Sequence, residues 1–169
     1  MTRGAAGRAA SAPPRRSPAE QQRLHAELTE LWERRISFNQ VLGLRLVSLQ
    51  PGDVRMRIDM RPELIGHYAY GRLHGGVISA SLDALGGLAL MVELGEKHPD
   101  EGAEQVMHRF ARMGTIDLRV DFMRQGIGQH FIGHALVTRL GGRIGSTQMR
   151  LHNDEGTLIA TAAASFVVS

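Results

Sequence analysis

One carboxylate stands alone in the only long apolar stretch of the sequence. Asp83 is the only charged residue between Arg72 and Glu93. Burying an ionised carboxylate without a partner costs free energy, and an apolar residue would pack better at such a position. A structural role, in which the carboxylate bonds a neighbouring helix or a backbone amide, explains Asp83 about as well as a chemical one. In the chemical interpretation the carboxylate is held dry to act as a nucleophile or a general base.

The start of the same stretch favours the chemical interpretation. His74, Gly75 and Gly76 open the apolar run, and the first amides of a helix that begins there lack intrahelical partners. These amides carry the positive end of the helix dipole, and without side chains they are open to a carbonyl oxygen or an anion. A Gly-Gly pair alone is equally typical of a tight turn. Together with Asp83 it predicts an oxyanion-binding amide and a nucleophile or base on one helix.

The spacing of these groups predicts a dimer. Asp83 follows Gly75 by eight residues, which is about 12 Å along an α-helix. One carbonyl group therefore cannot contact both within one chain. If both act on one substrate, they come from two copies that meet across a symmetric interface. Small residues in this stretch would permit close contact between helices: Ser79, Ala80, Ser81, Ala84, Gly86 and Gly87.

Hydrophobic periodicity predicts two helices that help to position these groups. Residues 75–94 are apolar or small on all sides, which is typical of a helix enclosed on nearly every side. Ser17-Pro18-Ala19-Glu20 is a capping box with proline at the first helical position, so an earlier helix is expected from there to about Arg35.

The remaining elements are expected to be strands. Residues 43–50 and 54–60 flank a Pro-Gly-Asp turn signal and predict a hairpin. Residues 115–122 alternate strictly between apolar and polar side chains, which predicts a half-buried strand. A three-stranded antiparallel meander is expected over 129–140, 144–151 and 157–168. The sum is an α+β fold in which a five- to six-stranded antiparallel sheet wraps around one long central helix.

Length and composition describe one globular domain. The chain has 169 residues, of which 17–169 are expected to fold and 1–16 to form a disordered leader. Residues 95–113 are expected to be an insertion after the central helix. The net charge is +3, and four arginines lie in the leader, so the remainder is close to neutral and nucleic acid is not an expected partner.

Two further features bear on location. Cysteine is absent, which removes disulfides and thiolate metal sites and fits a cytoplasmic protein. The apolar run 73–92 contains His74, Asp83 and four glycines, so it is interpreted as a buried helix and no membrane contact is expected.

The segment from Leu73 to Asp83 resembles the signature of hotdog-fold acyl-CoA thioesterases of the PaaI-like (phenylacetate-pathway) type. In that family an HGG turn opens the central helix, and the catalytic Asp lies nine residues after the His, as Asp83 does after His74. The resemblance covers about residues 40–168 and includes the strand 114–122. It implies a hotdog fold and hydrolysis of a fatty or aryl acyl-CoA without a cofactor. It also implies a homodimer, and further pairing into a homotetramer as a dimer of dimers.

The resemblance also implies the roles of individual residues. The Gly75 amide would polarise the thioester carbonyl, and Asp83 of the partner chain would attack it or activate a water molecule. Thr115 aligns with a family Ser or Thr that positions the water. His74 and Gly76 would complete the substrate-binding turn, with His74 orienting it through hydrogen bonds more readily than acting as a base.

Other substrate contacts are less closely matched to the family. Many relatives carry Asn or Gln six residues before the His, where Tyr68 stands here, so His67, Tyr68 or a backbone group would hold the carbonyl instead. Arg139 and Arg143 flank the turn at 141–142, where related enzymes place basic residues on CoA phosphates. An ordinary solvated hairpin end explains these two arginines equally well.

The insertion offers an apolar set that would suit a long acyl chain, although a small satellite core is the simpler interpretation. Its members are Val106, Met107, Phe110 and Met113.

Two other functions compete with hydrolysis. A hotdog hydratase would rely on a motif such as Asp-x-Asn-Pro-x-His, which the sequence lacks. A non-catalytic acyl-CoA sensor would need an output module, and the leader plus one helix is too short for a DNA-binding domain. A serine nucleophile is not favoured because no Gly-x-Ser-x-Gly is present. No metal site is expected, since the histidines are scattered and His130 and His134 on one strand would lie too far apart to share an ion.

Overall fold

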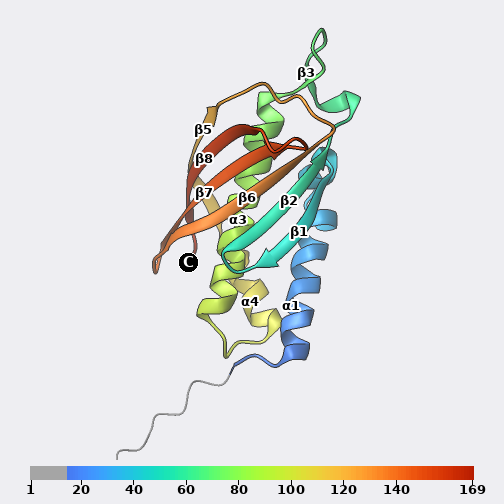
Figure 1. Ribbon diagram of the computed structural model, residues 1–169. Coiled ribbons are helices and arrows are strands. Elements are labelled where there is room, and N and C mark those ends of the chain that lie inside the picture. The colour runs from blue at the N-terminus through green and yellow to red at the C-terminus, as the bar shows by residue number, and fades with distance from the viewer. Residues whose placement is uncertain (1–14) are drawn as a thin grey trace, which may run out of the picture.

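An antiparallel sheet curves along one long helix in the computed structural model, which describes residues 15–169 (Figure 1). Most of the predicted leader, residues 1–14, lies outside that range. Arg16 does not fit the prediction of disorder, because its Nη2 donates to the carbonyl oxygens of Gly95 and His98 at 3.0 and 2.9 Å. These carbonyls stand where the long helix ends and lack helical partners, so a guanidinium is a favourable cap there.

The first helix, α1 (Pro18–Glu30), begins where the capping box predicts. Ser17 is the N-cap, and its side chain accepts a hydrogen bond from the Glu20 amide at 3.2 Å. Leu24 and Leu28 are the buried residues of this helix. The predicted start of α1 is therefore confirmed.

The chain continues through η1 (Leu31–Arg35), a π-helical turn, into α2 (Ser37–Leu42), which ends at Gly43 with φ of 70°. The predicted end near Arg35 matches the end of the π-helical turn. The six-residue helix α2 was not predicted, because fewer than two turns are too short to give a periodic pattern.

Six strands form the main sheet in the order β1-β2-β6-β7-β8-β5, and all neighbours are antiparallel. The predicted hairpin and the predicted meander are both confirmed. The strands are β1 (Leu44–Gln50), β2 (Asp53–Asp59), β5 (Gly114–Phe122), β6 (His130–Leu140), β7 (Ile144–Asn153) and β8 (Leu158–Val167).

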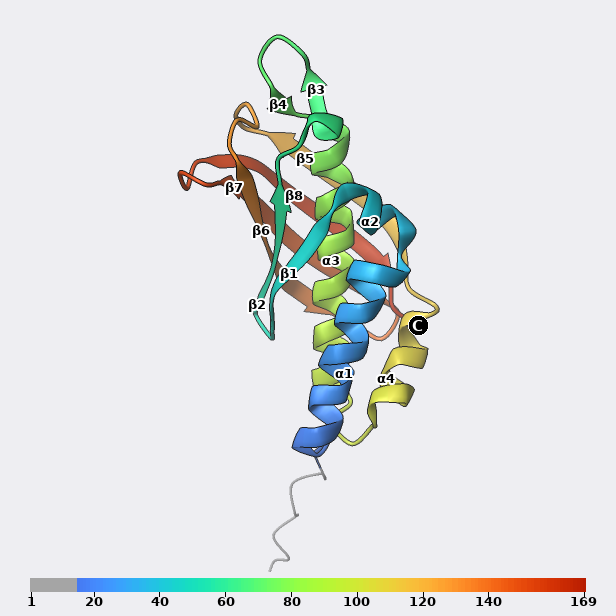
Figure 2. The same cartoon turned by 90° about the vertical axis from the view of Figure 1, so that its right-hand side faces the viewer.

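A second, two-stranded sheet projects beyond the N-terminal end of the central helix (Figures 1 and 2). It follows the short helix η2 (Pro62–Leu64) and consists of β3 (Ile65–His67) and β4 (Arg72–Leu73). This hairpin lies in a segment that the sequence indicated only as irregular, since strands of two and three residues carry no readable alternation.

The central helix, α3 (Gly75–Lys97), runs the length of the sheet. On one face Leu82, Leu85 and Leu90 are fully buried. Glycines let the sheet approach this face closely, because a Cβ on Gly133 would lie 2.9 Å from Cδ2 of Leu85. Length and composition alone would allow α3 to cross a membrane, but 56% of its apolar window is buried in the fold. The interpretation as a core helix is confirmed.

The opposite face of α3 corrects the expectation that the helix is enclosed on nearly every side. Ala80, Asp83, Gly87 and Met91 are only partly buried, and they recur at helical spacing. We call these residues, together with Ala84, the outward stripe. The stripe is apolar apart from Asp83, so the composition could not distinguish it from the face that packs on the sheet.

The predicted insertion 95–113 contains the last turn of α3 and a helix, α4 (Ala103–Phe110), that packs against α1 (Figure 2). Val106 and Phe110 are buried there. The satellite-core interpretation is therefore confirmed for these two residues.

Candidate active site

Asp83, on the outward stripe of α3, lies within hydrogen-bonding distance of Thr115. The Thr115 hydroxyl, at the start of β5, donates to Oδ1 of Asp83 at 2.9 Å. The register of β5 on β8 shifts between Thr115 and Asp117, so a bulge falls beside this contact. Asp83 is partly exposed in the single chain. The expectation of a dry carboxylate is therefore wrong for one chain, because an open cavity lies beside Asp83.

The turn before α3 is organised by His74. This residue is the N-cap of the helix, and its Nδ1 accepts a hydrogen bond from the Gly76 amide at 2.8 Å. An accepting Nδ1 carries no proton, so any hydrogen of the neutral ring is on Nε2. A Cβ on Gly76 would lie 2.9 Å from that same Nδ1. Glycine at position 76 therefore lets the His74 ring close the turn.

The Gly75 amide is available to a ligand, whereas the Gly76 amide is not. It is the first residue of α3, and the amide at this position has no intrahelical acceptor. The amide of Gly76, which the sequence assigned to the substrate, is used by His74. A Cβ on Gly75 would lie 3.4 Å from the ring of Phe122, the last residue of β5. Gly75 therefore lies beside the end of β5, whereas Asp83 lies beside its start.

An apolar cavity of about 300 Å³ opens beside Asp83 and Thr115. Its walls include Trp32 and Ile36 from η1 and its C-cap, Met91 of α3, and Met113 just before β5. Of the four apolar residues that the sequence offered from the insertion, Met113 lines this cavity and Val106, Met107 and Phe110 do not. The part of the cavity on α3 was missed, although Gly87 and Met91 follow Asp83 at successive intervals of four residues, which would have identified it.

The β3–β4 hairpin carries an aromatic group at its tip. The rings of His67 and Tyr68 are stacked with centroids 5.5 Å apart, and the ring of Tyr70 lies 4.9 Å from that of His67. Tyr68 is 94% exposed. A Cβ on Gly66 would lie 2.6 Å from Cα of His74, so the hairpin abuts the start of α3. In one chain, neither His67 nor Tyr68 lines the cavity beside Asp83.

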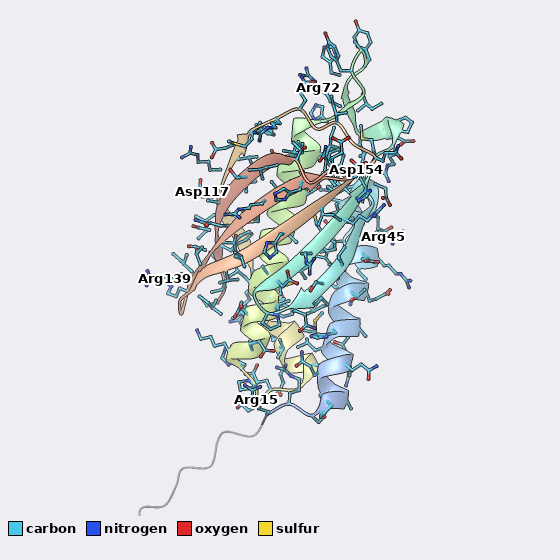
Figure 3. The ribbon with its side chains drawn as sticks, in the orientation of Figure 1. Arg15, Arg45, Arg72, Asp117, Arg139 and Asp154 are labelled. Atoms are coloured by element: carbon cyan, nitrogen blue, oxygen red, sulfur yellow. The ribbon has the colours of Figure 1, made fainter. Side chains whose placement is uncertain are left out.

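Arg139 and Arg143 lie at the opposite end of α3 from Gly75. They flank the β6–β7 turn, where Lys97 Nζ donates to the carbonyl oxygen of Gly141 at 3.2 Å. Figure 3 shows Arg139 at the end of the sheet that is remote from Arg72 and the hairpin. Lys97 is fourteen residues beyond Asp83, which is about 21 Å of helix. The structure of one chain therefore does not bring these arginines to the carboxylate.

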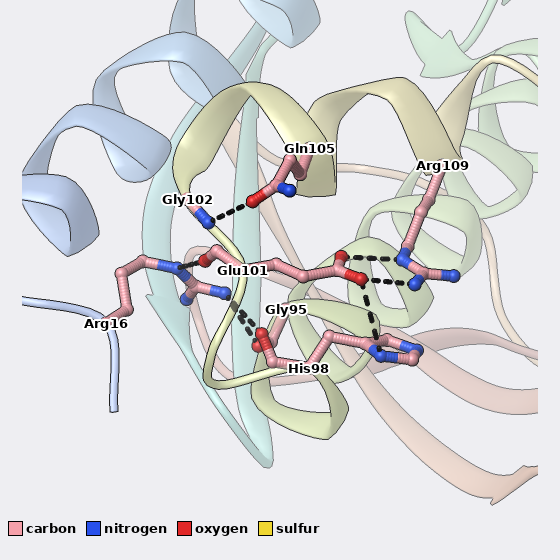
Figure 4. A network of polar contacts seen from close by, with 7 residues as sticks. All are labelled: Arg16, Gly95, His98, Glu101, Gly102, Gln105 and Arg109. Atoms are coloured by element: carbon pink, nitrogen blue, oxygen red, sulfur yellow. Dashed lines mark hydrogen bonds and ion pairs between the residues drawn. The ribbon is translucent and has the colours of Figure 1, made fainter. Parts of the chain in front are cut away.

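A second polar cluster joins the start of α1 to α4 (Figure 4). Glu101 accepts a hydrogen bond from Nε of Arg109 at 2.7 Å, and its backbone oxygen accepts one from Nε of Arg16 at 2.7 Å. The hydrogen bond from Arg109 is the main cause that lowers the pKa of Glu101, and the same bond raises the pKa of Arg109. A cavity of about 680 Å³ lies beside this cluster, lined by α4 and the C-terminal residues Val168 and Ser169. The larger cavity is thus separate from Asp83.

A six-stranded antiparallel sheet wrapped along one long helix that opens with a His-Gly-Gly turn defines the hotdog fold. Comparison with known proteins agrees with this class. The thioesterase superfamily matches residues 70–160. Two solved structures have the same fold. A protein from Shewanella oneidensis related to the thioesterase superfamily is 36% identical, with a TM-score of 0.84 over 90% of this chain and 99% of that one. The phenylacetic acid degradation protein PaaI from Thermus thermophilus is 19% identical, with a TM-score of 0.62 over 79% of this chain and 99% of that one, which supports the fold alone.

A curated relative is similar over most of its length. The medium/long-chain acyl-CoA thioesterase YigI of Salmonella typhimurium is 33% identical over 139 residues, which are 82% of this chain and 90% of the relative. The chain belongs to the thioesterase superfamily. The predicted class of enzyme, a thioester hydrolase with a hotdog fold, is confirmed.

Proposed function

We propose that the protein hydrolyses fatty acyl-CoA thioesters to a free acid and CoA, with Asp83 as the catalytic carboxylate. The observation that carries this proposal is the Thr115–Asp83 hydrogen bond at the mouth of an apolar cavity. An apolar pocket beside a carboxylate suits a substrate with a hydrophobic acyl group. The acyl chain would occupy the pocket, and its thioester carbon would lie next to the carboxylate. The similarity to the acyl-CoA thioesterase YigI supports acyl-CoA as the substrate.

Asp83 has one oxygen available for the reaction. Thr115 donates to Oδ1 and fixes the orientation of the carboxylate, which leaves Oδ2 free. As a general base, Oδ2 would take a proton from water while the water oxygen attacks the thioester carbon; the C–S bond then breaks and the thiolate of CoA takes up a proton. As a nucleophile, Oδ2 would itself attack the carbon, the C–S bond would break, and CoA would leave as a thiolate that takes up a proton. The mixed anhydride formed in this step is then hydrolysed by water, which restores the carboxylate and releases the free acid.

The edge of β5 supports a two-fold dimer. Among the described residues, β5 pairs with β8 on one side and with no strand on the other. Ile116 and Phe122 on this strand are 53% and 57% exposed. A long strand edge with exposed apolar side chains is usually covered in a native protein, and antiparallel pairing of two β5 strands about a two-fold axis would cover it.

The same pairing would complete the active site. Thr115 and Asp83 lie at the start of β5, whereas Phe122 and Gly75 lie at its end. In an antiparallel pair the start of one strand faces the end of the other. Asp83 of one protomer would then lie near Gly75 of the partner subunit, whose amide would stabilise the oxyanion. The proposal requires no contribution from Arg139 or Arg143.

Release of free thiol from a panel of acyl-CoAs tests the proposed activity. Asp83→Asn keeps the shape of the side chain but removes the base, and we expect kcat to fall by about 10²–10⁴-fold. Asp59→Asn is the matched control, since Asp59 is an exposed carboxylate that pairs, within residues 15–169, only with Arg57. A wild-type protein that binds acyl-CoA and releases no thiol would instead support the sensor function. An Asp83→Asn variant with the wild-type rate would exclude this mechanism.

Mixing two inactive variants tests whether the site is shared between protomers. Gly75→Pro removes the amide hydrogen, and Asp83→Asn removes the base. If each site combines Gly75 of one chain with Asp83 of the other, a heterodimer of the two variants contains one intact site and one doubly damaged site. We expect each heterodimer to regain about half of the wild-type activity. If both groups act within one chain, every site carries a defect and mixing restores nothing.

A further inference from the structure

Gly87 is a glycine that packing against the sheet does not explain. Its neighbour Gly86 faces the sheet, and a Cβ there would lie 2.8 Å from Oγ1 of Thr147. A Cβ on Gly87 would meet only Cε1 of Phe166 at 3.6 Å, an ordinary contact. Glycine inside a helix is destabilising relative to alanine. Packing therefore does not require glycine at position 87, which lies on the side of the helix that lines the cavity beside Asp83.

The cavity follows the outward stripe of α3 away from the carboxylate. Gly87 is one turn beyond Asp83 and Met91 is two turns beyond it, so all three lie on one face. Met113 precedes Thr115 by two residues and lines the same cavity. A chain that starts at Asp83 would thus pass over Gly87 and reach the two methionines.

The wall opposite α3 is held in a fixed position. Trp32 is 2% exposed, and its Nε1 donates to the carbonyl oxygen of Ala84 at 3.4 Å. Asn39 is 3% exposed, and its Nδ2 donates to the carbonyl oxygen of Trp32 at 2.9 Å. Both bonds are made by Trp32, the second residue of the π-helical turn, in which the Ile36 amide donates to the Leu31 carbonyl. Single π-helical turns are frequent at functional sites, and this one places Trp32 and its C-cap Ile36 in the wall of the cavity.

The volume of the cavity gives the order of magnitude of the size of its occupant. At about 30 Å³ for each group of the size of a water molecule, a cavity of 300 Å³ holds on the order of ten non-hydrogen groups. Apart from Asp83, the residues that line it are uncharged. An unbranched apolar chain of about this many carbons would fill it.

We infer that this cavity is the acyl site and that Gly87, Met91 and Met113 set the acyl-chain length, with medium-chain acyl groups preferred. This inference rests on the proposed hydrolysis of acyl-CoA. Within the cavity each further methylene raises kcat/KM about fourfold, which corresponds to the burial of one methylene group. Once the chain reaches Met91 and Met113 the gain stops.

Measuring kcat/KM for saturated acyl-CoAs from butyryl- to palmitoyl-CoA tests the inference. Gly87→Leu places a side chain across the path, so we expect butyryl-CoA to keep its rate and the longer substrates to lose about tenfold or more. Gly87→Ala adds one methyl group at an ordinary contact distance and cannot disturb folding through a clash. For this variant we expect the preferred length to move down by about one or two carbons.

Two methionines of the 95–113 segment form a matched pair. Met113 lines the cavity, whereas Met107 lies on α4 and does not. Met113→Ala should move the preferred chain length upward, and Met107→Ala should leave the profile unchanged. Profiles of Gly87→Leu and Met113→Ala that both match the wild type would overturn the inference while leaving the hydrolase activity in place. A wild-type protein that releases no thiol from any acyl-CoA would overturn the proposed function itself.

Discussion

The two faces of α3 are both largely apolar, but they differ in the size and the exposure of their side chains. The face toward the sheet carries leucines that are fully buried, such as Leu82 and Leu85. The outward stripe carries small residues, one methionine and one carboxylate, and it remains partly exposed. The neighbouring glycines at 86 and 87 show the contrast most directly, since one admits the sheet and the other borders a cavity. One apolar helix therefore packs against the sheet on one side and borders a cavity, the proposed acyl site, on the other.

After Asp83→Asn, the start of the helix should give the largest effect on activity without loss of the fold. Gly75→Pro removes the proposed oxyanion donor, and we expect kcat to fall by about 10²–10³-fold. Proline is favoured at the first position of a helix, and the extended backbone of His74 (φ −66°, ψ 137°) is compatible with a following proline. The measurement is the rate of thiol release, together with the unfolding midpoint of each variant.

Gly75→Ala is the control for that substitution. It introduces the same Cβ beside Phe122 but keeps the amide hydrogen, so it should retain far more activity than Gly75→Pro. Equal losses in the two variants would mean that steric contact, and not the amide, accounts for the effect.

The face toward the sheet should show the opposite pattern. Leu85 is fully buried, and Leu85→Ala should lower the free energy of unfolding by about 2–5 kcal/mol. Because Leu85 does not line the cavity beside Asp83, the relative rates on different acyl-chain lengths should not change. Urea denaturation and the acyl-CoA panel measure the two quantities. A changed chain-length profile would show that the two faces are not independent.

The adjacent glycines provide a smaller and more direct comparison. Gly86→Ala forces a Cβ against Thr147 and should destabilise the protein by about 1–3 kcal/mol. Gly87→Ala meets no such obstacle and should be neutral or stabilising by up to about 1 kcal/mol, as expected for alanine in a helix. The thermal unfolding midpoints of the two variants, each compared with that of the wild type, measure this difference. Equal destabilisation would contradict the different roles of the two positions.

The smallest effect is expected at the Glu101 cluster, far from the outward stripe. The bond from Arg109 holds the pKa of Glu101 below its ordinary value, so the pair stabilises the folded protein at pH values above the pKa of the unfolded chain. This stabilisation is lost as the pH falls through the lowered pKa of the folded state. Glu101→Gln should therefore cost less than about 1 kcal/mol near neutral pH and nothing in acid, as measured by urea unfolding at both conditions. A cost that persists in acid would rule out the ion pair as its source.

Long elements with clear end signals were predictable from the sequence. The capping box at Ser17, the hairpin from β1 to β2 and the meander from β6 to β8 all appear where they were expected. Helix α2 and the β3–β4 hairpin were not predicted, because segments of two to six residues show no measurable period. Alternation in β5 was predicted correctly, and Leu118 and Val120 are partly buried against the core as expected. Ile116 and Phe122 nevertheless remain exposed, because β5 is an edge strand among the described residues.

From the sequence alone it follows that Asp83 is the only charged residue between Arg72 and Glu93 and that Gly75 precedes it by eight residues. These facts are local, because helical rise and capping depend on residues a few positions apart. Only the tertiary structure decided that Thr115 bonds Asp83 and that Trp32 and Met113 wall the cavity beside it. Those residues come from segments far apart in the chain, and a hydrophobic pattern does not specify whether an apolar residue packs on its own sheet or faces a space that a substrate can fill.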